Sequence, residues 1–229
     1  RMHNGSRLLS LLLAVVLVFT LTVPALAADK PQDMNLRIAV MSDLHYLSPD
    51  MIADTADFEH ALNSDRKLLK ESSAILYEKF EQVRADKPDI LLVSGDLTKD
   101  GEQECHAALA KQLQQLQQDI PGLKIYVING NHDVNNSDAT DFSTCVKDSY
   151  GTATTSAMDP DLKTTPEEFK EIYYDVSYTD AIATYTPPEG KQQGSLSYVA
   201  RPAEGFTFIV MDSGKYSADV TDSGTDEHM

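Results

Sequence analysis

Basic residues are scarce in this chain of 229 residues, which has 19 lysines and arginines against 36 aspartates and glutamates. Only two of the basic residues and none of the acidic ones precede residue 28, so residues 28–229 carry a formal net charge of −19. A surface of this sign repels polyanions, and the chain has no basic stripe that could displace counterions from a nucleic acid. We therefore expect no nucleic-acid binding by charge. A bound metal cation could still reverse the field locally.

Long apolar runs are equally rare, and the one present is Leu8–Val23, which contains no charge. Two arginines precede it, Pro24 ends it, and Ala25-Leu26-Ala27 follows as a small-x-small site. This layout is typical of a secretory signal peptide over residues 1–27, with cleavage before Ala28. The alternative is an uncleaved membrane anchor, but the run is short of the roughly 20 residues that span a bilayer. We expect a secreted or cell-surface protein whose membrane contact is limited to an uncleaved signal segment.

Cysteine is nearly absent, with only Cys105 and Cys145 in the whole chain. An exported chain meets oxidising conditions, which allows a disulfide between them. Cys105, however, shares a helical face with Leu109, Leu113 and Leu116, and a buried free thiol fits that stripe equally well. Both alternatives stay open from the sequence, and the pair does not resemble a zinc motif.

Short apolar runs alternate with helical patterns in the first half of the chain. A polar linker covers residues 28–35, and a partial domain is expected over residues 36–229. The strands are predicted at Leu36–Met41, Ile90–Val93 and Ile125–Ile128, and the helices at Asp65–Val83 and Glu102–Gln118. Residues 46–63 read as an irregular connection. The order strand, helix, strand, helix, strand predicts an α/β fold with parallel pairing through right-handed crossovers.

The second half is less regular. Residues 135–164 are rich in Ser, Thr, Asp and Asn and are predicted to form a polar surface insertion. Thr165 and the proline and acids after it form a helix start, with Thr165 as N-cap. Ser195–Ala200 and Phe206–Met211 are predicted to form an antiparallel hairpin. Residues 213–229 are polar and show no periodicity.

Three short motifs follow the three predicted strands of the first half. They are Ser42-Asp43-Leu44-His45, Gly95-Asp96-Leu97-Thr98 and Gly130-Asn131-His132-Asp133. In an open parallel sheet, the loops at the carboxyl ends of the strands converge on the ligand crevice. Side chains that are far apart in the sequence can therefore meet in one place.

The side chains of these motifs suit a centre of two divalent metals. Asp43 offers a hard anionic oxygen and His45 a borderline nitrogen, Asp96 has two oxygens that could bridge two cations, and Asn131 offers a neutral carbonyl oxygen. Such a mixed set suits zinc, iron or manganese better than calcium. Two metals about 3.5–4 Å apart can clamp a phosphate and lower the pKa of a bridging water.

Two further histidines have contrasting expectations. His132 directly follows the candidate ligand Asn131, which places it to protonate a leaving oxygen. His106 sits one position off the apolar stripe of the second predicted helix, and we expect it to be a surface or edge residue.

With these motifs in view, the chain resembles the calcineurin-like metallophosphoesterase family. The pattern of that family runs D-x-H, then G-D, then G-N-H-D/E, then a lone His and finally G-H-x-H. The resemblance covers about residues 36–212 and extends to the secreted bacterial type. It implies a sandwich of two mixed β-sheets flanked by helices (αββα), incomplete in this chain.

The resemblance also implies roles for individual residues. His132 would be the acid or the phosphate contact, and Asp133 would support it as part of the catalytic set. The residues implied to bind metal are Asp43 and His45 at the first ion, Asp96 bridging both ions, and Asn131 at the second. Two divalent ions would be the cofactors, and the substrate would be a small-molecule phosphoester.

The chain departs from the family pattern after His132, since the only later histidine is His228. The three later histidines of the family are absent from these 229 residues. His228 reads as an ordinary exposed residue. We expect weak metal retention and little activity for this fragment alone, which has the features of part of a longer reading frame.

Three functions are therefore weighed. The first is an exported metal-dependent phosphoesterase that hydrolyses phosphomonoesters or phosphodiesters by attack of a dimetal-activated water. The second is a non-catalytic binding module of the same fold that lacks the downstream histidine ligands. The third is a single-metal hydrolase unrelated to phosphate, with Asp43, His45 and Asp96 as an open three-ligand site.

Overall fold

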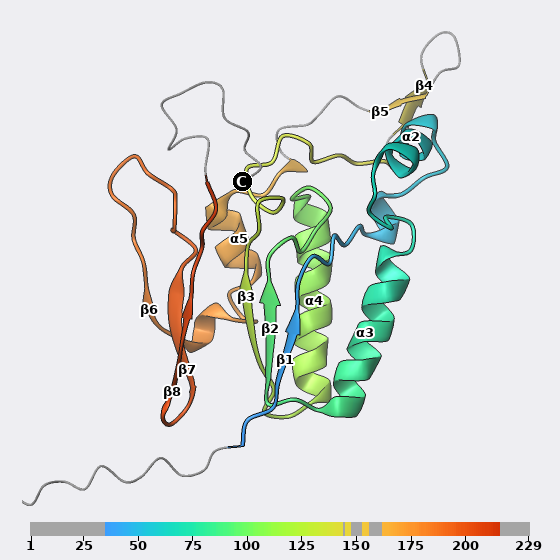
Figure 1. The fold of residues 1–229 in the computed structure, drawn as a ribbon. Coiled ribbons are helices and arrows are strands. Elements are labelled where there is room, and N and C mark those ends of the chain that lie inside the picture. The colour runs from blue at the N-terminus through green and yellow to red at the C-terminus, as the bar shows by residue number, and fades with distance from the viewer. Residues whose placement is uncertain (1–34, 144, 148–152, 156–161, 216–229) are drawn as a thin grey trace, which may run out of the picture. The chain divides into compact units, whose positions relative to one another are not determined.

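Two three-stranded sheets carry the fold of residues 36–229, which form one compact unit (Figure 1). The computed structural model describes residues 35–143, 145–147, 153–155 and 162–215. The predicted signal peptide, nearly all of the predicted linker and His228 lie outside these described residues. Among the described residues, no helix combines the length and the apolar composition needed to cross a bilayer.

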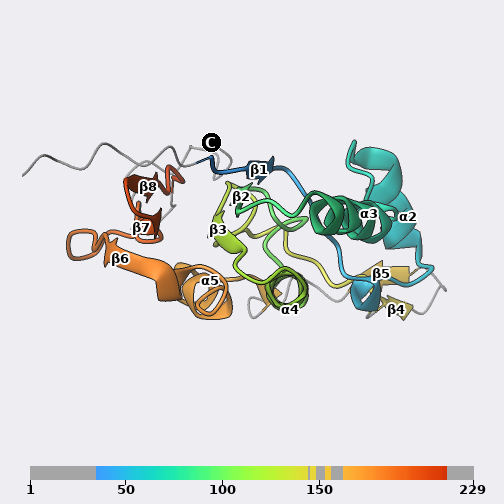
Figure 2. The same ribbon diagram turned by 90° about the horizontal axis from the view of Figure 1, so that it is seen from below.

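The first sheet is parallel, as the sequence predicts. Its strands are β1 (Ile38–Met41), β2 (Ile90–Ser94) and β3 (Lys124–Ile128), in that order across the sheet. Apolar residues dominate all three strands, and helices cover one side of the sheet (Figure 2). The helix between successive strands supplies the crossover connection that parallel pairing requires. The carboxyl ends of the three strands therefore lie at one edge.

Helices α3 (Ser72–Asp86) and α4 (Gln103–Asp119) are the crossovers, and α5 (Pro166–Ile172) lies next to α4 on the same side of the parallel strands (Figure 2). The predicted stripe of α4 is confirmed, because Cys105, Leu109, Leu113 and Leu116 are all buried. Cys105 is a free thiol in the structure, so the free-thiol alternative holds.

The start of α5 is also confirmed. Thr165 Oγ1 accepts a hydrogen bond from the Glu168 backbone N–H at 3.2 Å, and a carboxylate oxygen of Glu168 accepts one from the Thr165 backbone N–H at 2.8 Å. This reciprocal capping box satisfies two N–H groups that the first turn leaves without helical partners.

The second sheet is antiparallel and consists of β6 (Ala181–Thr184), β7 (Tyr198–Ala203) and β8 (Phe206–Val210). The predicted hairpin corresponds to β7 and β8, whereas β6 was not expected. The hydroxyl of Tyr198 bonds to the backbone of Val127 on β3, at 3.1 Å to N and 3.0 Å to O. The rings of Tyr126 and Phe208 pack with their centroids 5.8 Å apart. The second sheet is thus joined to β3 by both polar and apolar contacts.

The prediction for residues 46–83 was wrong in part. The expected irregular connection contains a 3₁₀ turn, η1 (Pro49–Met51), and a helix, α2 (Ala56–Ser64). Thr55 caps α2 by accepting a hydrogen bond from the Phe58 backbone N–H at 3.1 Å, and Phe58 itself is buried. The helix expected from Asp65 begins only at Ser72, because Asp65 is the C-cap of α2 and a turn separates the two helices.

The polar segment 135–164 is only partly described. Its strands β4 (Cys145–Lys147) and β5 (Ala153–Thr155) form an antiparallel pair. In the residues before β4, Ala139 and Phe142 are buried. The ring of Phe142 lies 5.3 Å from that of Phe58 on α2. This apolar contact is the reason that the start of the segment packs against the domain.

The predicted fold class is confirmed as α/β with two sheets flanked by helices. Among the described residues, one sheet is wholly parallel and the other wholly antiparallel. On β1, Ile38 and Val40 remain exposed, and the described residues place no element over that side of the strand.

Burial of the α4 stripe leads to a stability prediction. Leu109 is 0% exposed, whereas Leu68 is 64% exposed. We expect Leu109→Ala to lower the free energy of unfolding by about 2–5 kcal/mol, because it removes buried methyl groups and leaves a cavity. Leu68→Ala, the matched control, should change it by less than about 0.5 kcal/mol. Urea denaturation measures both, and equal losses for the two variants would contradict the assignment of this face as core.

Candidate metal centre

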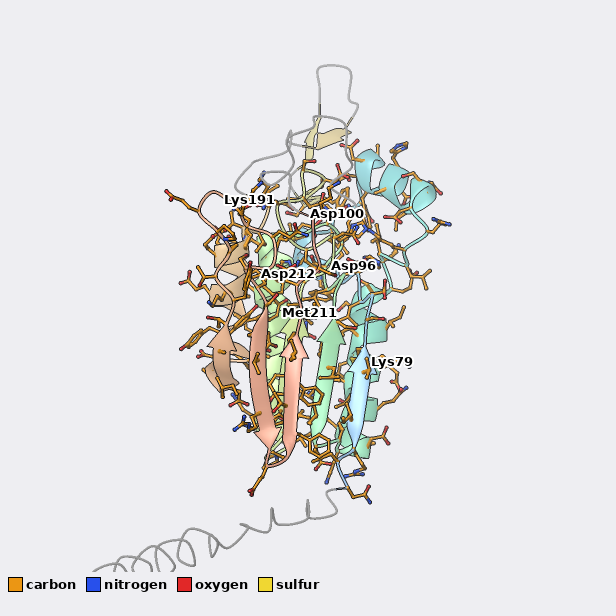
Figure 3. The ribbon with its side chains drawn as sticks, turned by 60° about the vertical axis from the view of Figure 1, so that its left-hand side comes forward. Lys79, Asp96, Asp100, Lys191, Met211 and Asp212 are labelled. Carbon is orange, nitrogen blue, oxygen red and sulfur yellow. The ribbon has the colours of Figure 1, made fainter. Side chains whose placement is uncertain are left out.

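The loops after β1 and β2 continue the parallel ladder beyond the strands. The backbone N–H of Asp43 donates to the carbonyl oxygen of Gly95 at 3.1 Å. The backbone N–H of His45 donates to the backbone carbonyl oxygen of Asp96 at 2.9 Å. A further bridge joins Tyr46 to Thr98. Figure 3 shows Asp96 and Asp100 at this same end of the sheets, near Met211 and Asp212. The first two motifs are therefore fixed side by side through their backbones.

Three of the predicted ligands have an unusual backbone. Asp43, His45 and Asp96 have φ values of 54°, 40° and 49°, in the left-handed region that residues other than glycine rarely adopt. Such conformations cost of order 1 kcal/mol or more each and persist where the surrounding structure enforces them. The hydrogen bonds between the two loops supply that enforcement and aim all three side chains.

The three side chains converge. Ligand atoms of Asp43, His45 and Asp96 all lie within 4.8 Å of one another. His45 Nε2 is 3.9 Å from Asp96 Oδ2, which is too far for a hydrogen bond. Two ligand atoms about 2.0–2.2 Å from a common divalent ion lie at most about 4.4 Å apart, and the separation of 3.9 Å falls within that limit. Two carboxylates and an imidazole brought this close therefore fit a cation between them.

The fourth predicted ligand, Asn131, borders a cavity together with two of the other three. A cavity of about 380 Å³ is bordered by Asp43, Asp96 and Asn131, with Met211 and Ser213 from the end of the second sheet on its rim. The structure thus brings the residues of all three motifs to one place, as their position after parallel strands predicts.

The second and third motifs touch directly. A Cβ atom on Gly130 would overlap the side chain and backbone nitrogen of Asp96, and a Cβ on Gly95 would come within 3.0 Å of Gly130 Cα. The backbone N–H of His132 donates to Asp96 Oδ1 at 3.2 Å. Only glycine at position 130 allows this approach. It brings the loop that carries the candidate ligand Asn131 against Asp96.

Asp133 holds these two loops together from inside the domain, where it is fully buried. Its Oδ1 accepts hydrogen bonds from the backbone N–H groups of Leu97 at 2.9 Å and Thr98 at 3.0 Å. Its Oδ2 accepts from Gly130 N–H at 2.7 Å. One carboxylate therefore links the Gly-Asp loop to the Gly-Asn-His-Asp loop, which is a positioning role consistent with the expected support of His132.

His106 corrects a prediction, because it is fully buried rather than at the surface or an edge. Its Nε2 lies 2.9 Å from the carbonyl oxygen of Asp133, and its Nδ1 lies 2.9 Å from the hydroxyl of Tyr173. Burial lowers the pKa of His106, against the nearby charge of Asp133, which raises it. A neutral ring with the proton on Nε2 satisfies both contacts. The polar partners at the end of α5 and in the loop replace the hydrogen bonds that the ring would make to water.

The remaining predicted residue, His132, has a carboxylate partner. Its Nδ1 lies 2.8 Å from Asp100 Oδ1, and this hydrogen bond raises the pKa of His132. Its ring lies edge to face with that of His45, with centroids 5.1 Å apart. Burial and the neighbouring Lys67 lower the pKa of His45. The pKa values of the two imidazoles are thus shifted in opposite directions. A neutral His45 suits a metal ligand, and a charged His132 suits a proton donor.

Sequence reasoning missed Asp100 and the cations around it. Asp100 lies four residues after Asp96, within the same loop. This short separation from the second motif could have marked Asp100 as a residue of the site. Lys99 contacts the carboxylate of Asp100 directly, and Lys67 reaches it from the segment between α2 and α3. No feature of the sequence marks Lys67, because it belongs to no motif.

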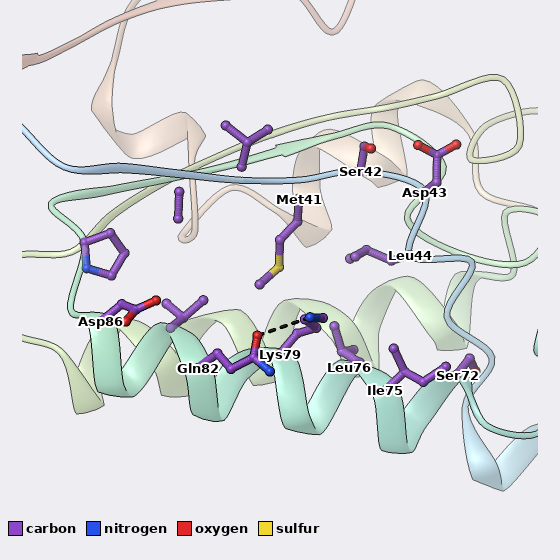
Figure 4. Close-up of a pocket in the computed structure, with 14 residues that line it drawn as sticks. Met41, Ser42, Asp43, Leu44, Ser72, Ile75, Leu76, Lys79, Gln82 and Asp86 are labelled. Atoms are coloured by element: carbon purple, nitrogen blue, oxygen red, sulfur yellow. Dashed lines mark hydrogen bonds between the residues drawn. The ribbon is translucent and has the colours of Figure 1, made fainter.

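A larger cavity, of about 470 Å³, lies between β1 and α3. Figure 4 shows mostly apolar side chains there, among them Met41, Leu44 and Leu76, with Lys79 hydrogen-bonded to Gln82 on the helix. Of the predicted site residues it borders only Asp43. Size therefore does not identify the site, whereas the convergence of ligand atoms does.

The fold and the site together define an α/β protein with a candidate metal centre at the carboxyl edge of a parallel sheet. The chain belongs to the calcineurin-like phosphoesterase family, whose sequence model matches residues 36–199. Members of this family are generally phosphoester hydrolases and typically use two metal ions. A search of curated proteins finds no match for the chain. The family resemblance stated from the motifs is confirmed.

The role of Asp133 can be tested by an isosteric change. We expect Asp133→Asn to lower the free energy of unfolding by about 1–3 kcal/mol, because the amide NH₂ must face a backbone N–H of Leu97, Thr98 or Gly130 and leaves it unsatisfied. Asp86→Asn, at an exposed position on α3, is the control and should have little effect. Chemical denaturation measures both. An unchanged stability for Asp133→Asn would show that the loops do not depend on this carboxylate.

Glu102 is a buried acid next to the site. Its side chain accepts a hydrogen bond from the Asp100 backbone N–H at 3.0 Å. Burial raises its pKa to about 7 from an ordinary value of 4.5, although Lys99 and this hydrogen bond act in the opposite direction. The folded protein therefore keeps a proton that the unfolded chain releases between these two values. The stability that this proton gives is complete below the unfolded-state pKa and is lost as the pH rises through the folded-state pKa.

Comparison with Glu102→Gln isolates this effect, because the amide does not titrate. The titration of the other groups contributes equally to both proteins and cancels in the difference. We expect the unfolding free energy of the wild type, relative to that of the variant, to fall by up to about 1.4 kcal/mol per pH unit between the two pKa values. Denaturation series from acid to neutral pH measure the difference. A difference that does not change with pH would contradict the raised pKa.

Proposed function

We propose that the protein hydrolyses small-molecule phosphoesters, either monoesters or diesters, at a centre of two divalent metal ions. The observation that carries the proposal is the approach of Asp43, His45 and Asp96 to within 4.8 Å at the carboxyl edge of the parallel sheet. The family match supports the phosphoester as the substrate class. The acidic surface makes phosphate binding improbable anywhere except beside cations.

Four residues of the chain would bind the two ions. Asp43 and His45 would bind the first ion, Asp96 would bridge both through its two oxygens, and Asn131 would bind the second. This mixed nitrogen and oxygen set favours manganese, iron or zinc. When bound, two such ions lower the pKa of a bridging water and stabilise in-line attack on phosphorus.

His132 would supply the proton for the leaving oxygen. Its Nδ1 is engaged by Asp100 at 2.8 Å, so Nε2 would be the ring nitrogen that donates the proton. The hydrogen bond to Asp100 favours the charged ring, which keeps that proton available. Asp133 contributes by fixing the loop that carries both Asn131 and His132.

We further propose that the protein acts outside the cytoplasm, in the secreted or cell-surface compartment. The charged start, apolar run and Ala-x-Ala site of residues 1–27 support this location. The sequence of the amino terminus of the exported protein would test it directly, with Ala28 as the expected first residue.

Asp96→Asn tests the hydrolytic centre in the full-length protein. We expect at least about a 100-fold loss of kcat/KM on bis(p-nitrophenyl) phosphate and p-nitrophenyl phosphate with added Mn²⁺, because a neutral amide bridges two cations poorly. Bound metal per chain should fall in parallel. Asp54→Asn, at an exposed position before α2, is the matched control and should leave both measurements unchanged.

The other outcomes are also informative. Metal binding without turnover in the wild type would favour the non-catalytic binding module. One ion per chain with turnover of a substrate other than a phosphoester would favour the single-metal hydrolase. Full activity in Asp96→Asn would overturn the proposed centre.

A further inference from the structure

Lys67 joins the segment between α2 and α3 to the loop after β2. Its Nζ lies 3.1 Å from the carbonyl oxygen of Lys99 and 3.4 Å from Asp100 Oδ1. The side chain is only 16% exposed, although it comes from a connecting segment. Asp65 Oδ1 accepts the Lys67 backbone N–H at 3.0 Å, which fixes the turn from which the side chain extends. These contacts fix the position of the Lys67 ammonium group beside the site.

Two groups of opposite hydrogen-bonding character face Nδ1 of His132. Asp100 Oδ1 lies 2.8 Å away and Lys67 Nζ lies 3.3 Å away. An ionised carboxylate only accepts and an ammonium only donates, so Nδ1 can bond to one of them at a time. The shorter contact would bring two lone pairs together if Nδ1 carried no proton. The geometry thus requires Nδ1–H donated to Asp100, with Lys67 donating to the same Oδ1 from the other side.

The carboxylate of Asp100 is held at both oxygens. Lys99 contacts Oδ2, while Lys67 and His132 share Oδ1. Asp100 is buried, and burial alone would raise its pKa, but the hydrogen bond from His132 and the charges of Lys99 and Lys67 lower it to about 2. Lys99 is the cation at Oδ2 and Lys67 is the cation at Oδ1, so a cation contacts each oxygen of the carboxylate.

We propose that Lys67 is a positioning residue for His132. It holds Asp100 Oδ1 in the place where this oxygen accepts the proton on Nδ1, and so fixes one tautomer and one orientation of the ring. The catalytic consequence rests on the function proposed above, whereas the structural claim stands without it. The segment before α3, which contains none of the three motifs, would thereby contribute to the site.

The tautomer of His132 can be measured without turnover. Full-length protein labelled with ¹⁵N-histidine is prepared without metal at a pH well above the ordinary imidazole pKa, and long-range ¹H–¹⁵N spectra are recorded. His132→Gln assigns the signal of His132 among those of the other histidines. We expect the wild type to show the Nδ1–H tautomer. A wild type with the proton on Nε2 would overturn the proposal whatever the variants do.

Variants of Lys67 distinguish its positioning of Asp100 from the effect of removing any one positive charge. We expect Lys67→Met to move the two ring nitrogen shifts toward each other, as a mixture of tautomers does, while Lys67→Arg keeps the wild-type pattern. Lys70→Met removes an equal charge at an exposed position three residues on and should change nothing. A wild-type spectrum in Lys67→Met would overturn the proposal. If Lys67→Met does not fold, Lys67→Gln replaces it with the same expected mixture.

Kinetics on the metal-loaded full-length protein give the second readout. Lys67→Met should lower kcat about tenfold and leave KM within about twofold, and Lys67→Arg should recover most of the loss. A raised KM at unchanged kcat would mean that Lys67 contacts substrate, which overturns the positioning role. If the wild type hydrolyses no phosphoester, the proposed function fails, while the spectra still decide the role of Lys67.

Discussion

The backbone contact between the loops after β2 and β3 is the constraint on which the rest of the site depends. Gly130 has no side chain, so it lies against Asp96, and the carboxylate of Asp133 accepts hydrogen bonds from both loops. Because the loops approach this closely, the candidate ligands of the first two motifs lie near the loop that carries Asn131. A side chain at position 130 would overlap Asp96 and displace its carboxylate. His106, buried beneath the loop, fixes the carbonyl of Asp133 from the helical side.

The net charge of the chain does not show that positive side chains gather beside the site. The chain is strongly acidic, yet Lys67 and Lys99 gather beside Asp100, one on each carboxylate oxygen. They neutralise a buried acid rather than form a basic surface. The acid in turn bonds to His132, which raises the pKa of that ring. The same local charges that permit Asp100 to be buried therefore prepare a proton donor next to the candidate ligands.

The parallel strands, the stripe of α4 and the cap of α5 could be predicted because each depends on residues close in sequence. The gathering of Asp43, His45, Asp96 and Asn131 was also predictable, since parallel strands bring their carboxyl ends to one edge. Helix α2 was missed because its evidence is a single cap at Thr55 and one buried ring. His106 was misplaced and Lys67 overlooked for a different reason. Their partners, Tyr173 and Asp100, are distant in sequence, and periodicity carries no information about contacts of that kind.

The central claim is that these motif side chains hold two cations in one hollow. The most direct test is a crystal structure of the full-length protein soaked in Mn²⁺, with anomalous scattering measured from the metal. We expect two anomalous peaks about 3.5–4 Å apart, with Asp96 between them, Asp43 and His45 at one peak and Asn131 at the other. Density for ordered side chains with no anomalous peak among them, at saturating Mn²⁺, would contradict the account.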